Sequence, residues 1–175
     1  MTEHYLMFAG YNAWANERLY AAAEKLTDAE YNTDRGAFFK SVHGTLNHLL
    51  VGDRIWMQRL TGKGEAPARI DMILFDDLPA LAAARRDEDA RISDWIGALG
   101  KADLDRSFTY RTITNPATVT QPLAPALDHF SNHQTHHRGQ AHCLLTAMRG
   151  QDLAPSLDLI LFQRQTGQGG VKQQV

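Results

Sequence analysis

Histidine is the residue type that most clearly suggests chemistry in this sequence, because five of its eight histidines fall within residues 129–142. Neutral imidazole is a good ligand for zinc, nickel and iron. Residues four apart on an α-helix lie about 40° apart around the axis and one turn along it, so a His-x-x-x-His pair can direct two rings toward one ion. Two such pairs are present, His129 with His133 and His133 with His137.

A helical wheel distinguishes between these two pairs. Hydrophobic residues at helical spacing define the apolar stripe of the segment, namely Leu127, Phe130, Ala141, Leu144, Leu145 and Met148. His137 lies about 30° and His133 about 70° from the centre of that stripe, whereas His129, His136 and His142 lie more than about 100° away. We therefore expect His133 and His137 to face the core and to supply two ligands of one divalent metal ion.

A functional metal site needs at least one more protein ligand and open positions for water or substrate. That ligand must come from another helix, and periodicity leaves His4, His43, His48 and the carboxylate Asp53 as alternatives. A helix rich in histidine can also be a hydrogen-bonded core element or a polar face without any metal. The His-Glu-x-x-His protease motif, the Glu-x-x-His pairs of di-iron bundles and the Cys-x-x-Cys-His haem motif are absent from the sequence.

The composition excludes several classes of partner. The 175 residues are 43% hydrophobic, which suffices for one compact domain with a core. The net charge is −2 and the 18 Lys and Arg residues are scattered, so no nucleic-acid or membrane surface is predicted. No apolar run could span a bilayer and no signal peptide is apparent, so we expect a soluble cytoplasmic protein. The single cysteine, Cys143, excludes an internal disulfide and is expected to be a small packing residue.

Four long helices are expected to position the histidines. Apolar residues at spacings of three and four predict helices over residues 3–26, 41–60, 78–99 and 123–148. Asn12 and Asn16 of the first helix lie either inside its apolar stripe or on the edge of that stripe. The third helix is expected to bury Leu81, Ala84, Trp95 and Ala90 or Arg91, and to turn its dense charges outward.

Shorter elements are expected to connect and follow these helices. Thr27-Asp28-Ala29-Glu30 has the form of a capping box, and Ser41 is a suitable N-cap for the second long helix. Residues 105–121 contain strand formers around Asn115-Pro116, which predicts a small hairpin. A short extra helix is expected after Pro155, and the Gly- and Gln-rich residues 166–175 are expected to form a flexible tail. The whole pattern predicts an all-α, antiparallel four-helix bundle within one domain of residues 1–165.

The motifs on these helices resemble the DinB branch of the DinB/YfiT-like superfamily of metalloenzymes over nearly the whole chain. The resemblance is carried by Tyr11–Leu19, Ser41–Leu50, Gly52–Trp56 and His133–Gln140. It implies a three-histidine metal site with one ligand in the Asn-His-Leu-Leu segment and two in the His-x-x-x-His-Arg-Gly-Gln segment. Residue by residue, it selects His48, His133 and His137. It also implies a homodimer.

The resemblance sets the expectation for function without naming a substrate. The wider superfamily includes thiol-dependent transferases and isomerases that use mycothiol, bacillithiol or glutathione, whereas most members of the DinB branch have no assigned reaction. We expect one divalent metal ion, zinc or nickel ahead of iron or manganese, which lowers the pKa of a bound low-molecular-weight thiol or water and delivers it to a small electrophile. The protein would be a hydrolase or an S-transferase. The alternative is a non-catalytic protein that binds a metal or a small ligand in a stress or damage response.

Six further residues are candidates for orienting the ligands or the substrate. They are Asn12, Asn16, Asp53, His136, Arg138 and Gln140. Hydrogen bonds between helices would explain each of them equally well. For Arg138 two fates are considered, recognition of a carboxylate on a thiol cofactor or substrate, and a surface salt bridge.

Overall fold

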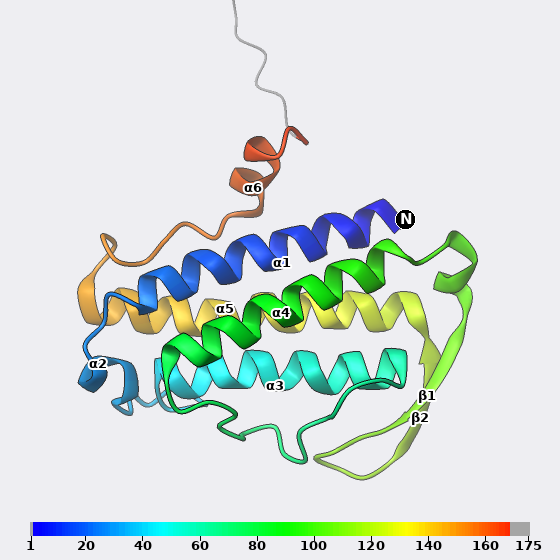
Figure 1. Cartoon of the computed structure of the whole chain (residues 1–175), viewed down its shortest axis with the longest axis horizontal. Helices are drawn as coiled ribbons and strands as arrows, with labels where there is room; N and C mark the ends of the chain where they lie inside the picture. The colour runs from blue at the N-terminus through cyan, green and yellow to red at the C-terminus, as the bar shows by residue number, and fades with distance from the viewer. Residues whose placement is uncertain (1, 169–175) are drawn as a thin grey trace, which may run out of the picture.

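The computed structural model describes residues 2–168, and their architecture is all-α with one small hairpin (Figure 1). Four long helices form the bundle, α1 (Thr2–Ala23), α3 (Val42–Thr61), α4 (Leu78–Gly97) and α5 (Leu123–Arg149). Helix α1 packs against α4 and α5, and α3 packs against the same two helices. The all-α fold and the four long helices predicted from periodicity are confirmed.

The connection formed by residues 62–77 determines the direction of α4. It returns along the bundle, so that α3 and α4 both run from the end that carries α2 toward the end that carries the hairpin (Figure 1). Helices α1 and α5 run the opposite way. The pairs α1–α4 and α3–α5 are therefore antiparallel, whereas α3 and α4 are parallel neighbours. A short link would have forced α4 to run antiparallel to α3.

The shorter elements are α2 (Asp28–Asn32), the 3₁₀ helix η1 (Lys101–Asp105), β1 (Ser107–Arg111), β2 (Thr118–Pro122) and α6 (Leu159–Gln165). Strands β1 and β2 pair antiparallel with Thr109 opposite Thr120, as the strand-forming composition predicted. Helix α6 confirms the extra helix predicted near the C-terminus. The predicted flexible tail begins at residue 166, and its residues 169–175 lie outside the described residues.

Helix α3 begins and ends at the residues that the sequence predicted. The Ser41 hydroxyl accepts a hydrogen bond from the Gly44 N–H at 3.0 Å, which satisfies one free donor of the first turn. Gly62 adopts φ 69°, in the left-handed region, and its N–H donates to the Gln58 carbonyl at 2.8 Å. The capping box of α2 is also present, with the Glu30 carboxylate accepting from the Thr27 N–H at 2.9 Å.

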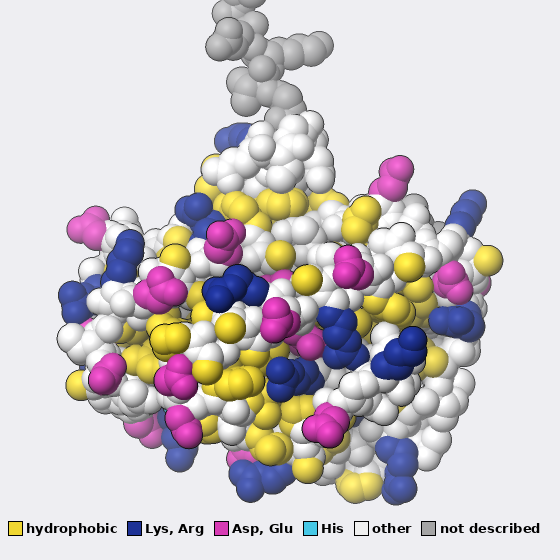
Figure 2. All heavy atoms as spheres, viewed as in Figure 1, with side chains coloured by type: hydrophobic (Ala, Val, Ile, Leu, Met, Phe, Trp, Pro, Cys, Tyr) yellow, Lys and Arg dark blue, Asp and Glu magenta, His cyan; other side chains and the backbone are white. Residues whose placement is uncertain are grey.

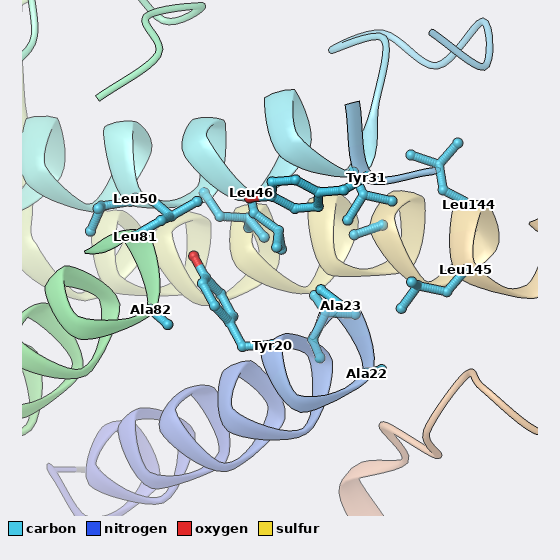
Figure 3. Packing of buried hydrophobic residues seen from close by; sticks show 14 of the residues in the cluster. Tyr20, Ala22, Ala23, Tyr31, Leu46, Leu50, Leu81, Ala82, Leu144 and Leu145 are labelled. Carbon is cyan, nitrogen blue, oxygen red and sulfur yellow. The ribbon is translucent and has the colours of Figure 1, made fainter. Parts of the chain in front are cut away.

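Two apolar clusters occupy opposite ends of the bundle. The cluster near α2 contains Tyr20, Leu46, Leu81 and Leu145, each from a different long helix (Figure 3). The cluster near the hairpin includes Trp56 together with side chains from α1, α4 and α5. Each long helix also buries polar residues between the two clusters. A polar layer therefore crosses the middle of the core.

Ion pairs and amide hydrogen bonds hold this polar layer together. Arg85 of α4 pairs with Asp53 of α3 at 2.7 Å and with Asp89, one turn further along α4, at 2.9 Å. From α1, the amide nitrogens of Asn12 and Asn16 each donate to Asp89 Oδ1 at 3.0 Å. Both asparagines therefore lie inside the core rather than on the edge of the stripe. We call this cluster, with the α5 residues described next, the buried polar layer.

Helix α5 contributes Gln134 and Arg138 to the buried polar layer. Gln134 donates to the Asp53 carboxylate, and it also donates to the Leu49 carbonyl at 3.2 Å. Arg138 donates to the Asn12 side-chain carbonyl, and its guanidinium lies 5.2 Å from the centre of the Tyr11 ring. Arg138 is only 2% exposed. The surface salt bridge considered for Arg138 is therefore wrong, because the side chain is buried and bonds to α1.

The orientation predicted for the third helix is also partly wrong. Leu81 and Ala84 are buried as expected, but the inner stripe of α4 continues through Arg85, Glu88 and Ile92. Of Ala90 and Arg91, the two alternatives for an inward position, Ala90 is exposed and Arg91 is half-buried. The prediction placed charged residues outside because unpaired charges are rarely buried, and it could not see the partners on other helices.

Charges of both signs are mixed on the face of the molecule that Figure 2 shows. On the face formed by α1 and α4, acidic and basic side chains are interspersed, with hydrophobic side chains between them (Figure 2). Cys143 lies exposed on α5, so its prediction as a packing residue is wrong. No helix within residues 2–168 combines the length and the hydrophobicity needed to cross a membrane.

Arg85→Ala should strongly destabilise the protein. The substitution leaves the Asp53 and Asp89 carboxylates without their cation in the core, which typically costs about 3–5 kcal/mol. Chemical denaturation followed by circular dichroism measures the loss. Arg86→Ala is the matched control, because Arg86 is the exposed neighbour on the same helix and should change the free energy of unfolding by less than about 0.5 kcal/mol. Equal stability of the two variants would contradict a structural role for the ion pairs.

Candidate metal site

Three histidines from two helices converge where α3 packs against α5. One ring nitrogen of His48, on α3, lies within 4.8 Å of one ring nitrogen from each of His133 and His137, on α5. The ring centroids are separated by 4.3 Å for His48 and His137, 4.4 Å for His133 and His137, and 5.3 Å for His48 and His133. The structure thus brings together the pair that the helical wheel favoured and the third histidine that the resemblance selected.

A backbone hydrogen bond orients the His48 ring. Its Nδ1 lies 2.7 Å from the Ile70 carbonyl oxygen. A carbonyl can only accept, so Nδ1 carries the proton and Nε2 carries the lone pair. That Nε2 atom is buried and has no hydrogen-bond partner among the described residues. Burying an unsatisfied acceptor costs free energy, and a cation in front of it would remove that cost.

Gln140 gives His137 the same orientation. The Nδ1–H of His137 donates to Gln140 Oε1 at 2.8 Å, which leaves Nε2 as the nitrogen with the lone pair. The amide nitrogen of Gln140 in turn lies 3.3 Å from the His136 ring. Among the six residues considered for orienting roles, Gln140 is the one that hydrogen-bonds a histidine of the cluster. His136 packs edge-on against His137 with centroids 4.7 Å apart.

The other candidates lie elsewhere. The Nε2–H of His43 donates to the Phe75 carbonyl at 2.9 Å, and His4 is exposed near the start of α1. Asp53 is committed to Arg85 in the buried polar layer, which also contains Asn12, Asn16 and Arg138. These residues support the helices that carry the cluster and do not hydrogen-bond its rings.

Two residues that the sequence reasoning missed shape the cluster. The Phe39 ring stacks on His48 with centroids 3.7 Å apart and planes inclined by 15°. Gly52 lies one turn after His48, and a Cβ built on Gly52 would come within 2.9 Å of Cε1 of His133. Gly52 is therefore needed for the His133 ring to approach α3. Gly52 could have been found from the sequence, because a residue four positions after His48 lies on the same face of the helix. Nothing in the local sequence indicated the stacking of Phe39.

Burial keeps all three rings neutral at physiological pH. Desolvation is the main cause that lowers the pKa of His48 to about 4 and the pKa of His133 to about 3. Repulsion from the neighbouring imidazoles lowers the pKa of both rings further. The pKa of His137 is also lowered, again mainly by burial. Neutral imidazoles with free lone pairs are the form that binds a metal ion.

A cavity of about 350 Å³ opens beside the cluster. His48 and His133 line its inner end, and the rest of its wall comes from α3, α5, Ile70 and the β1–β2 hairpin. This volume lies in the lower part of the range of roughly 300–1,000 Å³ typical of small-molecule pockets. The cluster is therefore accessible to a small ligand from one side.

Gly52→Ala should displace the His133 ring. The added methyl group overlaps Cε1 of His133, and overpacking of this kind typically costs about 1–3 kcal/mol. Thermal unfolding and the imidazole nitrogen signals in NMR spectra measure the two effects. Gly139→Ala is the matched control, because no atom lies within 4 Å of the position of its Cβ. That control should gain up to about 1 kcal/mol from helix propensity. Equal gains in both variants would show that His133 does not depend on Gly52.

Comparison with known proteins shows the family of the chain. The sequence profile of the DinB family matches residues 1–163. The chain is also 26% identical, over 165 residues, to Protein DinB of Bacillus subtilis (strain 168), an alignment that covers 89% of this chain and 92% of that protein. The match includes all four long helices and every histidine of the cluster. The chain belongs to the DinB family.

Proposed function

We propose that His48, His133 and His137 hold one divalent metal ion. The observation that carries the proposal is the convergence of three neutral imidazoles, two of which have a buried nitrogen with no hydrogen-bond partner among the described residues, Nε2 of His48 and Nδ1 of His133. A donor set of three imidazoles suits zinc and nickel best, and iron and manganese are alternatives. When bound, such an ion lowers the pKa of a thiol or water in its open positions and polarises an electrophile.

The reaction that fits this site is attack by a small thiol or by water on a small electrophile. Three protein ligands leave coordination positions free, and the cavity beside His48 and His133 can admit the reactants. The protein supplies no cysteine nucleophile there, because Cys143 lies six residues beyond His137, about 9 Å along the axis of α5. The described residues hold the rings, exclude bulk water from their buried side and fix their tautomers. We therefore favour a metal-dependent hydrolase or thiol S-transferase.

A non-catalytic protein that binds a metal or a small ligand is the second candidate. The buried side of the cluster favours it, since Phe39 and the Ile70 backbone enclose His48 and stabilise a fixed arrangement.

The homodimer and the single domain of residues 1–165 stay predictions from the sequence.

Metal retention tests the site directly. Protein purified without an affinity tag should contain about one divalent ion per chain by elemental analysis, because the three ligands are preformed. The double variant His133→Ala/His137→Ala should contain close to none. The matched control, His129→Ala/His142→Ala, removes two histidines of the same helix that lie outside the cluster and should retain the metal. Equal, near-zero metal in all samples would contradict the proposal.

Thiol consumption separates the enzyme from the binding protein. Metal-loaded protein is mixed with glutathione and benzyl chloride, and the free thiol that remains is measured with a thiol-reactive dye. The sulfur replaces chloride on the benzylic carbon, so one thiol is consumed for each chloride released. Wild-type protein should accelerate this loss at least about tenfold over His48→Ala, because Lewis-acid stabilisation is worth several kcal/mol. Identical rates would favour the non-catalytic binding protein.

A further inference from the structure

One stripe of α3 leads from the histidine cluster to an arginine. His48, Gly52, Trp56 and Arg59 follow at spacings of four, four and three, so they share a face of the helix. All four line the cavity of about 350 Å³. Gly52 contacts His133 at one end, and Arg59 lies seven residues further on, which is about 10 Å along the helix axis. The cavity therefore has two polar ends.

Arg59 is positioned by aromatic rings rather than by an acid. Its guanidinium lies 4.9 Å from the centre of the Trp56 ring and 4.6 Å from the centre of the Tyr110 ring. One Nη2–H donates to the Arg111 carbonyl at 3.2 Å. Within residues 2–168, Arg59 forms no ion pair with a carboxylate. Its other donors stay available to a ligand.

The charge of Arg59 is uncompensated within the cavity. The described lining contains no Asp or Glu, and Arg59 is its one Lys or Arg. Burial lowers the pKa of Arg59, although a guanidinium stays protonated at any physiological pH. A planar cation that packs against two aromatic rings and lacks an acidic partner is suited to bidentate recognition of a carboxylate.

The wall between the two ends has an apolar part and a polar part. The apolar part is formed by Ile55 and Trp56 of α3, Ile70 of the long connection, and Tyr110 and Ile113 of the hairpin, and the polar part by Thr112, Thr114, Asn115 and His129. The apolar part suits an aromatic or aliphatic group on the ligand.

We propose that this cavity binds a small organic carboxylate with an apolar body, that Arg59 binds the carboxylate, and that the other end of the ligand lies at the three histidines. The inference rests on the proposed function for the role of that second end. It assigns to Arg59 the recognition of a substrate carboxylate that the sequence had suggested for Arg138, which is buried in the core. Arg59 thus determines which electrophiles reach the cluster.

Binding to the metal-free protein tests the carboxylate site separately from the metal. Full-length protein is freed of metal with a chelator and titrated by calorimetry with 3-phenylpropanoate and with its neutral amide, 3-phenylpropanamide. The acid should bind at least about tenfold more tightly, because a charge-assisted hydrogen bond is worth roughly 1.5–3 kcal/mol. Glutathione, which carries carboxylates on a polar body, should bind more weakly than the acid. Tighter binding of glutathione would overturn the apolar part of the proposal.

Substitution of Arg59 identifies the recognising group. Arg59→Gln should reduce the affinity for the acid to that for the amide, while the affinity for the amide changes by less than about twofold. Arg59→Lys should restore part of the preference because it keeps the charge. Arg54→Gln is the matched control, since Arg54 lies on α3 over the Phe75 ring and outside the cavity. A purely structural Arg59 would make Arg59→Gln weaken both ligands equally.

The outcomes distinguish this inference from the proposed function. Equal binding of acid and amide to wild-type protein, or an equal loss of both in Arg59→Gln, would overturn the role of Arg59 whatever the metal content. A second outcome combines the two experiments. If the preference for the acid depends on Arg59, but the protein as purified contains no metal, the carboxylate site is supported and the metal centre is refuted.

Discussion

The ion pairs of Arg85 with Asp53 and Asp89 are the interaction on which the rest of the bundle depends. They place three charges in the core, and each carboxylate must keep its partners because an unpaired buried charge is too costly. Amide side chains from α1 and α5 complete the arrangement. An apolar contact tolerates small shifts of one helix along another, whereas these directional bonds do not. The buried polar layer therefore fixes the positions of all four long helices relative to one another along the bundle axis.

The same layer aims the histidines. On α5, Gln134 and Arg138 each directly follow a histidine of the cluster, so the two pairs point about 100° apart around the axis. Because Gln134 and Arg138 are held by α3 and α1, the rotation of α5 is fixed. His133 and His137 then project toward α3 without needing contacts of their own to set their direction. On α5, one pair of residues four apart, Gln134 and Arg138, enters the core, and the preceding pair, His133 and His137, forms the candidate site.

The sequence predicted those features that depend on local periodicity and capping. The start of α3 followed from Ser41, and the inward direction of His133 and His137 followed from the wheel. It misjudged α4 because hydrophobicity alone could not show that Arg85 has partners on other helices. The stripe Leu127, Phe130, Gln134, Arg138 and Ala141 was nevertheless readable, since its spacing runs through two polar residues. The stacking of Phe39 on His48 was beyond prediction, because it depends on how the loop directly before α3 folds back onto the helix.

The hydrogen bond from His48 to the Ile70 carbonyl makes the orientation of the ring sensitive to some changes in the long connection and not to others. Because the acceptor belongs to the backbone, the identity of the side chain at position 70 does not decide whether the bond forms. The bond forms when the backbone of the connection follows a path that places the carbonyl next to the His48 ring. A change of the side chain at position 70 therefore leaves the acceptor of this bond in place. Insertions or deletions in residues 62–77 would move the carbonyl, so the orientation of the ring depends on the length of the connection.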